Sequence, residues 1–229
     1  MKHPKFFLMV VALMATSNIL SATVIGTVTF SCLTDSSAAC LDLGNQMKLQ
    51  VTDLAPAGQV DLRLLNSGPT SSIITTAYFD MGNTSVLSSI ASVSAISGNV
   101  SFEDASPGGT LPGGNGNPYK FSSDFSVDRT SKGGVTNGID VGEGLKIIFN
   151  LAPGATPADV FNSIGGPLDS SKLRIGIHVQ SIDGQGFPSG ASRGMAANPS
   201  PNAVVPEPST YMLGGAALSL LGFLRRRQK

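Results

Sequence analysis

Histidine and cysteine, the residues most often used for acid–base or nucleophilic chemistry near neutral pH, are scarce in this chain of 229 amino acids. The chain has two histidines, two cysteines and no tryptophan. Catalysis by serine, histidine and aspartate would need His178 as the base, but no G-x-S-x-G sequence presents a nucleophile. His178 also lies within an alternating pattern typical of a strand, where a solvated histidine is common. We therefore predict no catalytic residues and no enzyme activity.

Two alternatives to a purely structural protein remain open. A secreted hydrolase needs only a pair of carboxylates across a cleft, and the sequence cannot locate such a pair among its acidic residues. A carbohydrate-binding module is the other alternative, although the body offers only Tyr78 and Tyr119 besides its phenylalanines for stacking on sugars. Asp140 with Glu143 and Asp80 with Asn83 are candidate calcium ligands, but both pairs occur in glycine-containing turns without the EF-hand pattern, so we predict no metal site and no cofactor.

The distribution of charge argues against a partner that is a nucleic acid. Six of the 15 basic residues lie in the first or last five positions, whereas Glu207 alone of the 15 acidic residues lies near an end. The body between the ends therefore carries a net charge of about −5, which repels phosphate backbones.

The N-terminal segment has the order of a secretory signal peptide. Basic residues at Lys2 and Lys5 precede a mostly apolar run from Phe6 to Leu20, which small residues at Ser21 and Ala22 follow. This run is shorter than the roughly 20 apolar residues of a membrane-spanning helix. We predict that residues 1–22 form a signal helix, that cleavage follows Ala22, and that the protein is exported.

Export sets the expected state of the two cysteines. Cys32 and Cys40 both follow the predicted signal, and an oxidising compartment favours a disulfide between them. A zinc site is the rival interpretation, but the body supplies only His178 as a further nitrogen ligand. We predict the disulfide.

Residues 23–197 are predicted to form one all-β body. Apolar and polar residues alternate with period two in several segments, which is typical of half-buried antiparallel strands. With less regular runs at 73–79, 86–96 and 100–103 included, the pattern predicts about nine strands, packed as an antiparallel β-sandwich of two sheets. The clearest segments are 24–32, 47–52, 60–64, 121–128, 145–151 and 172–180.

Two connections in the body have their own signals. Thr156, Pro157 and Asp159 predict the start of one short helix, which Gly165 and Gly166 end. The segment from Pro107 to Pro118 is rich in glycine and proline and has no apolar pattern, so it is predicted to be a long loop.

The C-terminal region has three parts after a proline-rich linker at 198–205. Pro206, Glu207 and Pro208 form a tripeptide, residues 211–224 are apolar, and Arg225, Arg226 and Arg227 form a basic cluster. This order closely resembles the PEP-CTERM sorting signal of exported Gram-negative bacterial proteins, over residues 206–229. The resemblance implies a transmembrane helix at 211–224, retained by the arginines in the inner membrane until exosortase acts on the motif.

The resemblance also implies a destination and partners. Exosortase is the expected processing enzyme, and the cell surface or an exopolysaccharide matrix is the expected location. A weakly acidic exterior rich in serine and threonine suits a hydrated polysaccharide. The sequence thus predicts a non-enzymatic structural or adhesive protein of the surface or biofilm matrix, with exopolysaccharide as a candidate partner.

Overall fold

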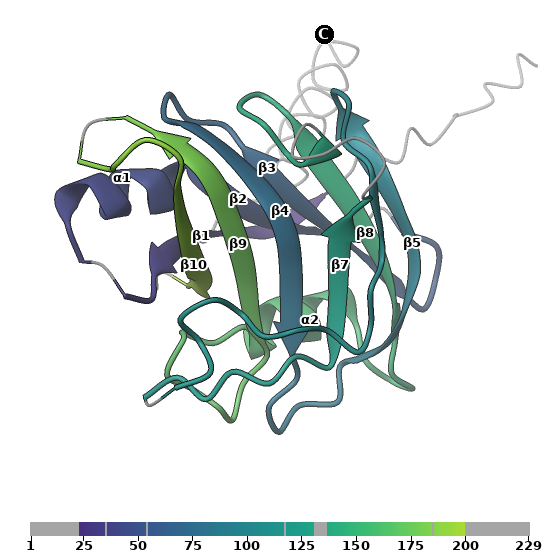
Figure 1. Ribbon diagram of the computed structural model, residues 1–229. Coiled ribbons are helices and arrows are strands. Elements are labelled where there is room, and N and C mark those ends of the chain that lie inside the picture. Colours follow the sequence, from purple (N-terminus) through teal and green to yellow (C-terminus); the bar gives the residue numbers. More distant parts are fainter. Residues whose placement is uncertain are drawn as a thin grey trace, which may run out of the picture.

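The structure, a computed structural model, describes residues 23–199 except residues 35, 54, 117, 131–136 and 185 (Figure 1). Ten antiparallel strands form one nearly closed sheet, accompanied by two short helices. The strands are β1 (Val24–Cys32), β2 (Met47–Thr52), β3 (Gln59–Asn66), β4 (Ser71–Asp80), β5 (Leu87–Ser97), β6 (Phe102–Asp104), β7 (Phe125–Arg129), β8 (Gly144–Leu151), β9 (Arg174–Asp183) and β10 (Ala191–Asn198). The helices are α1 (Ala38–Gln46) and α2 (Pro157–Ser163).

The all-β prediction is confirmed, but the prediction of two separate sheets is wrong. The strands follow one another in the order β5-β8-β3-β2-β1-β10-β9-β4-β7-β6, each hydrogen-bonded to the next. Figure 1 shows β10, β9, β4 and β7 as the near wall and β2, β3 and β8 behind them. Register shifts in four of the pairings allow the sheet to bend until β5 and β6 approach each other. Alternation could not reveal this, because a curled sheet and a sandwich both bury one face of every strand.

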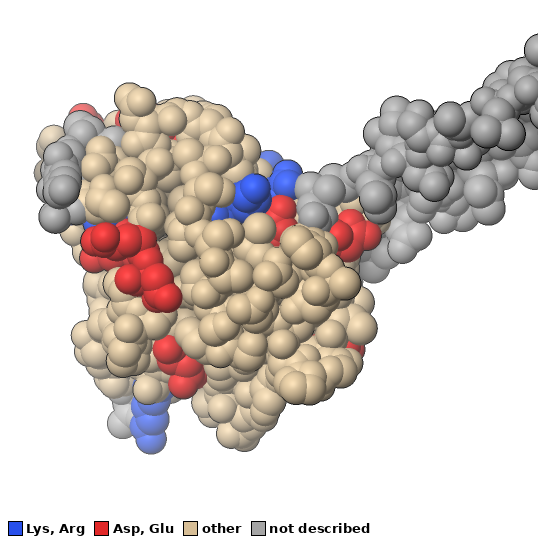
Figure 2. Space-filling view, turned by 90° about the vertical axis from the view of Figure 1, so that its right-hand side faces the viewer, with Lys and Arg blue, Asp and Glu red and all other residues tan. Residues whose placement is uncertain are grey.

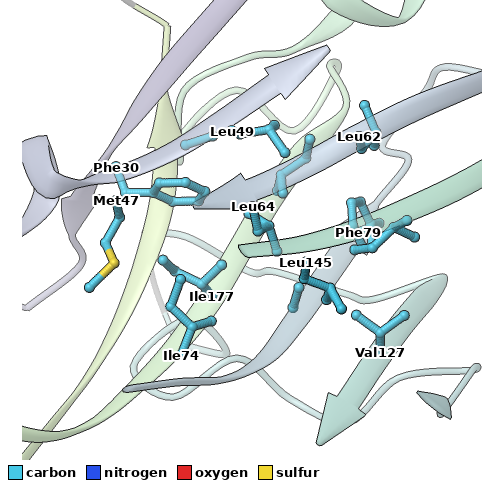
Figure 3. Packing of buried hydrophobic residues seen from close by; sticks show 14 of the residues in the cluster. Phe30, Met47, Leu49, Leu62, Leu64, Ile74, Phe79, Val127, Leu145 and Ile177 are labelled. Atoms are coloured by element: carbon cyan, nitrogen blue, oxygen red, sulfur yellow. The ribbon is translucent and has the colours of Figure 1, made fainter. Parts of the chain in front are cut away.

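The interior of the curled sheet is filled by apolar side chains from both walls. Figure 3 shows Phe79 and Ile177 from the near wall facing Leu62, Leu64 and Leu145 from the far wall. All of these are fully buried, and the Phe79 and Phe149 rings meet edge to face with centroids 4.8 Å apart. The alternating apolar positions of the sequence thus form a single core.

One of the two helices was predicted from the sequence and the other was not. The predicted helix is α2, and its capping box is present: Thr156 Oγ1 accepts from the Asp159 N–H while Asp159 accepts from the Thr156 N–H. Helix α1 was not predicted, although Ser37 caps it by accepting from the Cys40 N–H at 3.3 Å. The predicted disulfide between Cys32 and Cys40 is present and joins β1 to α1.

The segment between β6 and β7 is a loop, as predicted, but it is packed tightly onto the outside of the sheet. Leu111 is fully buried there in a second cluster with Leu33, Tyr78, Phe121 and Ala196. Glycine in the sheet makes this approach possible: a Cβ on Gly194 would lie 1.8 Å from the Pro112 carbonyl oxygen. The close contact with the backbone of the loop therefore explains why β10 has a glycine at position 194, which the alternation of apolar and polar residues does not explain.

A buried ion pair holds this loop and its neighbours on the sheet. The guanidinium of Arg174 on β9 donates to the carboxylate of Asp80 on β4 and to the carbonyl oxygens of Tyr119, Lys120 and Pro167. Asp80 also accepts from the Ser122 N–H at 2.7 Å. Because both charged groups are almost fully buried, each depends on these partners.

Replacing Arg174 with methionine should lower the free energy of unfolding by about 3–5 kcal/mol, because Asp80 is left buried without its counter-ion. Urea denaturation of the exported protein measures the loss, and limited proteolysis should cut the 105–124 loop sooner. Lys172→Met is the matched control: Lys172 is exposed, so its loss should change stability by less than about 0.5 kcal/mol. Equal losses in the two variants would contradict a special role for the pair.

Candidate functional site

The outer face of the near wall is divided by the packed loop. Beyond the loop, polar side chains form a row across adjacent strands, which we call the polar row. It consists of Ser192 on β10, His178 on β9, Thr76 on β4, Asp128 on β7 and Glu103 on β6. The register places Thr76 beside His178, Asp128 beside Thr76, and Glu103 beside Asp128. This is the part of the near wall where hydrogen-bonding side chains gather next to one another.

Two side-chain hydrogen bonds join members of the polar row. His178 Nε2 lies 2.7 Å from Ser192 Oγ, and Thr76 Oγ1 donates to Asp128 Oδ1 at 3.0 Å. These distances resemble parts of a serine–histidine–aspartate arrangement, but Thr76 stands between the histidine and the acid. Asp128 therefore orients a threonine rather than the imidazole, which differs from the catalytic arrangement.

His178 is poised to stay neutral near pH 7. Partial burial lowers its pKa below the usual value of 6.5, the carboxylate of Asp128 raises it, and the positive charge of Arg129 lowers it further. Gln180 lies beside the same ring nitrogen at 3.4 Å. A neutral imidazole both donates and accepts hydrogen bonds, so the row presents both kinds of group.

Most other acidic groups that the sequence brought into question have structural partners. Glu143 accepts from the Asp140 N–H and the Asn99 N–H at 3.0 Å each, and Asp80 Oδ1 accepts from the Gly82 N–H at 2.9 Å. These carboxylates therefore stabilise turns. Among the described residues, no group of three or more histidine, cysteine or acidic side chains is arranged to hold a metal ion.

A second polar region lies at the end of α1. An open hollow of about 410 Å³ is lined by residues of α1, the start of β2 and the β3–β4 turn, including Asp42, Lys48 and Thr70. Behind it, the buried amide of Gln46 donates to Asn66 Oδ1 at 2.8 Å and to Ser72 Oγ at 3.0 Å. The amide of Gln46 thus joins α1 to β3 and β4. The hollow itself is a wide depression of the surface.

The predicted site residues fall into two groups. The cysteines are joined as predicted, whereas Pro206, Glu207 and Pro208, the 211–224 segment and Arg225–Arg227 lie outside the described residues, as does the predicted signal at 1–22. Within residues 23–199, where described, no helix is long and apolar enough to cross a membrane. The polar row was not predicted, because its members come from five strands whose order the sequence does not reveal.

The lowered pKa of His178 predicts a pH effect on stability. The unfolded chain binds a proton near pH 6.5 more readily than the folded protein, so the free energy of unfolding should fall as pH drops from 7.5 to 5.5. His178→Gln should weaken this slope, since His3 is the only other histidine of the chain. Urea midpoints of both proteins at the two pH values measure it; identical slopes would show that His178 is not responsible.

Comparison with known proteins identifies the C-terminal end. The family model described as the PEP-CTERM protein-sorting motif matches residues 204–228, which include the predicted tripeptide and arginine cluster. No curated protein and no solved structure matches the chain. The match is confined to the last part of the chain and does not extend into the β body. The chain carries a PEP-CTERM protein-sorting motif, which implies an exported protein that is processed by exosortase.

Proposed function

We propose that this protein is a non-enzymatic structural or adhesive component of the cell surface or the exopolysaccharide matrix. The motif at 204–228 carries the proposal, because it implies export and processing. In the proposed sequence of events, the N-terminal signal starts export, the 211–224 segment holds the chain in the inner membrane, and cleavage near the motif releases the β body.

The β body supports a role that depends on its exterior. Its interior is filled by one apolar cluster, so partners have to bind on the outside of the sheet or on its loops. On the side where β5 lies, Figure 2 shows a broad uncharged surface with acidic groups gathered along one flank. Hydroxyl-rich, weakly acidic surfaces stay hydrated beside a polysaccharide, which suits a matrix component.

The distances along the chain fit processing without unfolding of the body. The last strand ends at Asn198, and Pro206 is eight residues further along. A chain of that length reaches at most about 27 Å, so the motif can lie at the membrane surface while the body stays folded outside. Residues 211–224 would span about 21 Å as a helix, short against the roughly 30 Å of the hydrocarbon core, which suits a transient anchor better than a permanent one.

Changing Pro206-Glu207-Pro208 to three alanines should block release. In a host with active exosortase, we expect the wild-type protein to appear outside the membrane without Arg225–Arg227, and the variant to remain in the membrane at full C-terminal length. Fractionation and intact mass measurement separate the two forms.

Replacing Pro199 and Pro201 with alanine provides a matched control, because both prolines lie in the linker and outside the motif. We expect that variant to be processed like the wild type. Recovery of surface protein that retains the three arginines from the exosortase host would show that the tail is an ordinary anchor.

The polar row favours carbohydrate binding as a second candidate function. It offers a hydroxyl at Ser192, an imidazole at His178 and a carboxylate at Asp128 on one side of the sheet, and sugar hydroxyls pair with such groups. Glu103 extends the row at the edge of the wall. In this proposal, the row is the surface that contacts the polysaccharide.

His178→Ala combined with Asp128→Ala should reduce retention of the exported protein by the host's exopolysaccharide at least fivefold in a co-sedimentation assay. Asp42→Ala removes an exposed acid from α1 and serves as the control, with retention unchanged. Equal retention of all three proteins would reject the row as the binding surface, and shortening of the polysaccharide by the wild type would favour a hydrolase instead.

A further inference from the structure

We propose that β5 is a self-pairing edge, through which two copies of this protein join their sheets by antiparallel β5–β5 pairing. β5 is one end of the strand order and is paired on one side only, with β8. The other end of the sheet, β6, comes near β5, but the two are not joined in a ladder. A row of backbone N–H and C=O groups on β5 therefore remains available to another strand.

The exposure of β5 sets it apart from the rest of the sheet. Eight of its 11 residues are exposed and one, Leu87, is buried, whereas the neighbouring β8 has no exposed residue. Ile90 and Val93, which face the core beside Phe149 and Ile147, are only half-buried. β5 thus extends beyond the packed interior, with both of its faces accessible.

The sequence of β5 lacks the features that normally prevent edge pairing. Charged residues and proline blunt exposed edges, and β5 has neither: it consists of serine, alanine and aliphatic residues. No charged residue occurs between Asp80 and Glu103. Figure 2 shows the corresponding uncharged surface on this side of the molecule.

The two ends of the sheet differ in a way that selects the partner. β6 carries Glu103 and Asp104, and Asp128 lies beside Glu103 on β7. Two copies meeting at β6 would bring these acids together, and a β6–β5 contact would form an open chain of molecules. Two copies meeting at β5 place no charged residues of the paired strands opposite each other and form a closed pair with two-fold symmetry. A second copy of β5 is therefore the occupant that the charges favour.

The ladder between β5 and β8 indicates where such pairing would be centred. Its register shifts fall between Leu87 and Ser89, between Ile90 and Ser92, and between Ala95 and Ser97. The stretch from Ser92 to Ala95 is regular and presents an unbroken length of edge. Ser92, where this stretch begins, is also the midpoint of the 11 residues of β5, so a two-fold axis there would pair the full strand and place Ser92 of one copy opposite Ser92 of the other.

Ser92→Lys tests the pairing, because two lysines would then lie opposite each other across the axis. We expect the full exported chain, extracted with mild detergent so that the result is independent of C-terminal cleavage, to sediment as a dimer. Ser92→Lys should raise the dimer dissociation constant at least tenfold. Ser189→Lys, the same change at an exposed position in the β9–β10 loop, should leave it unchanged.

A crosslink supplies a second measurement that does not depend on charge. Cysteines directly opposite each other in an antiparallel pair lie within disulfide reach, and the two native cysteines are already joined. Ser92→Cys, or Ser94→Cys if the register is shifted, should yield an oxidised dimer, and Ser189→Cys should not. A monomeric wild type at high protein concentration, or a dimer that Ser92→Lys leaves intact without a crosslink at either β5 position, would overturn the proposal.

Discussion

The buried ion pair between Asp80 and Arg174 holds the loop between β6 and β7 against the outer face of the sheet. One guanidinium joins adjacent strands to three backbone carbonyls in two separate loops. Burying two charges is costly unless they are paired and hydrogen-bonded, so the loops that supply the carbonyl partners are held against the pair, although Arg174 Nε itself has no hydrogen-bond partner among the described residues. The loop then covers the part of the near wall around Gly176 and Gly194, and Ser192, His178 and Asp128 of the polar row lie outside it, exposed or half-buried.

The packed interior has a complementary effect. Strand barrels that bind small molecules need an unfilled centre, whereas apolar side chains from both walls fill this one. A binding partner therefore has to contact the outer faces or the two ends of the sheet, because the interior has no room for it. Those surfaces differ in chemistry: the near wall offers hydroxyl, imidazole and carboxylate groups, one end of the sheet is acidic, and the other is uncharged.

The sequence predicted local features well and spatial neighbours poorly. Period-two alternation located most strands, the Thr156–Asp159 signal located α2, and the disulfide followed from export, because each depends on residues close in the chain or on the compartment. The closure of the sheet and the polar row depend on strand order, which alternation does not encode. β10 was missed because its three alanines and Gly194, which the Pro112 carbonyl approaches closely, weaken the apolar pattern. Glycine on an outer face was the available clue to that close approach.

The position of β10 has a mechanical consequence under the proposed retention of the chain by its C-terminal segment. β10 is the last strand before the sorting region, yet it lies in the middle of the sheet between β1 and β9. A force transmitted along the tail therefore enters a strand that is hydrogen-bonded on both sides. Two ladders resist it together, so the tether cannot peel the body apart one edge strand at a time. The same placement means that the sheet is complete only when β10, the strand next to the sorting region, has paired with β1 and β9.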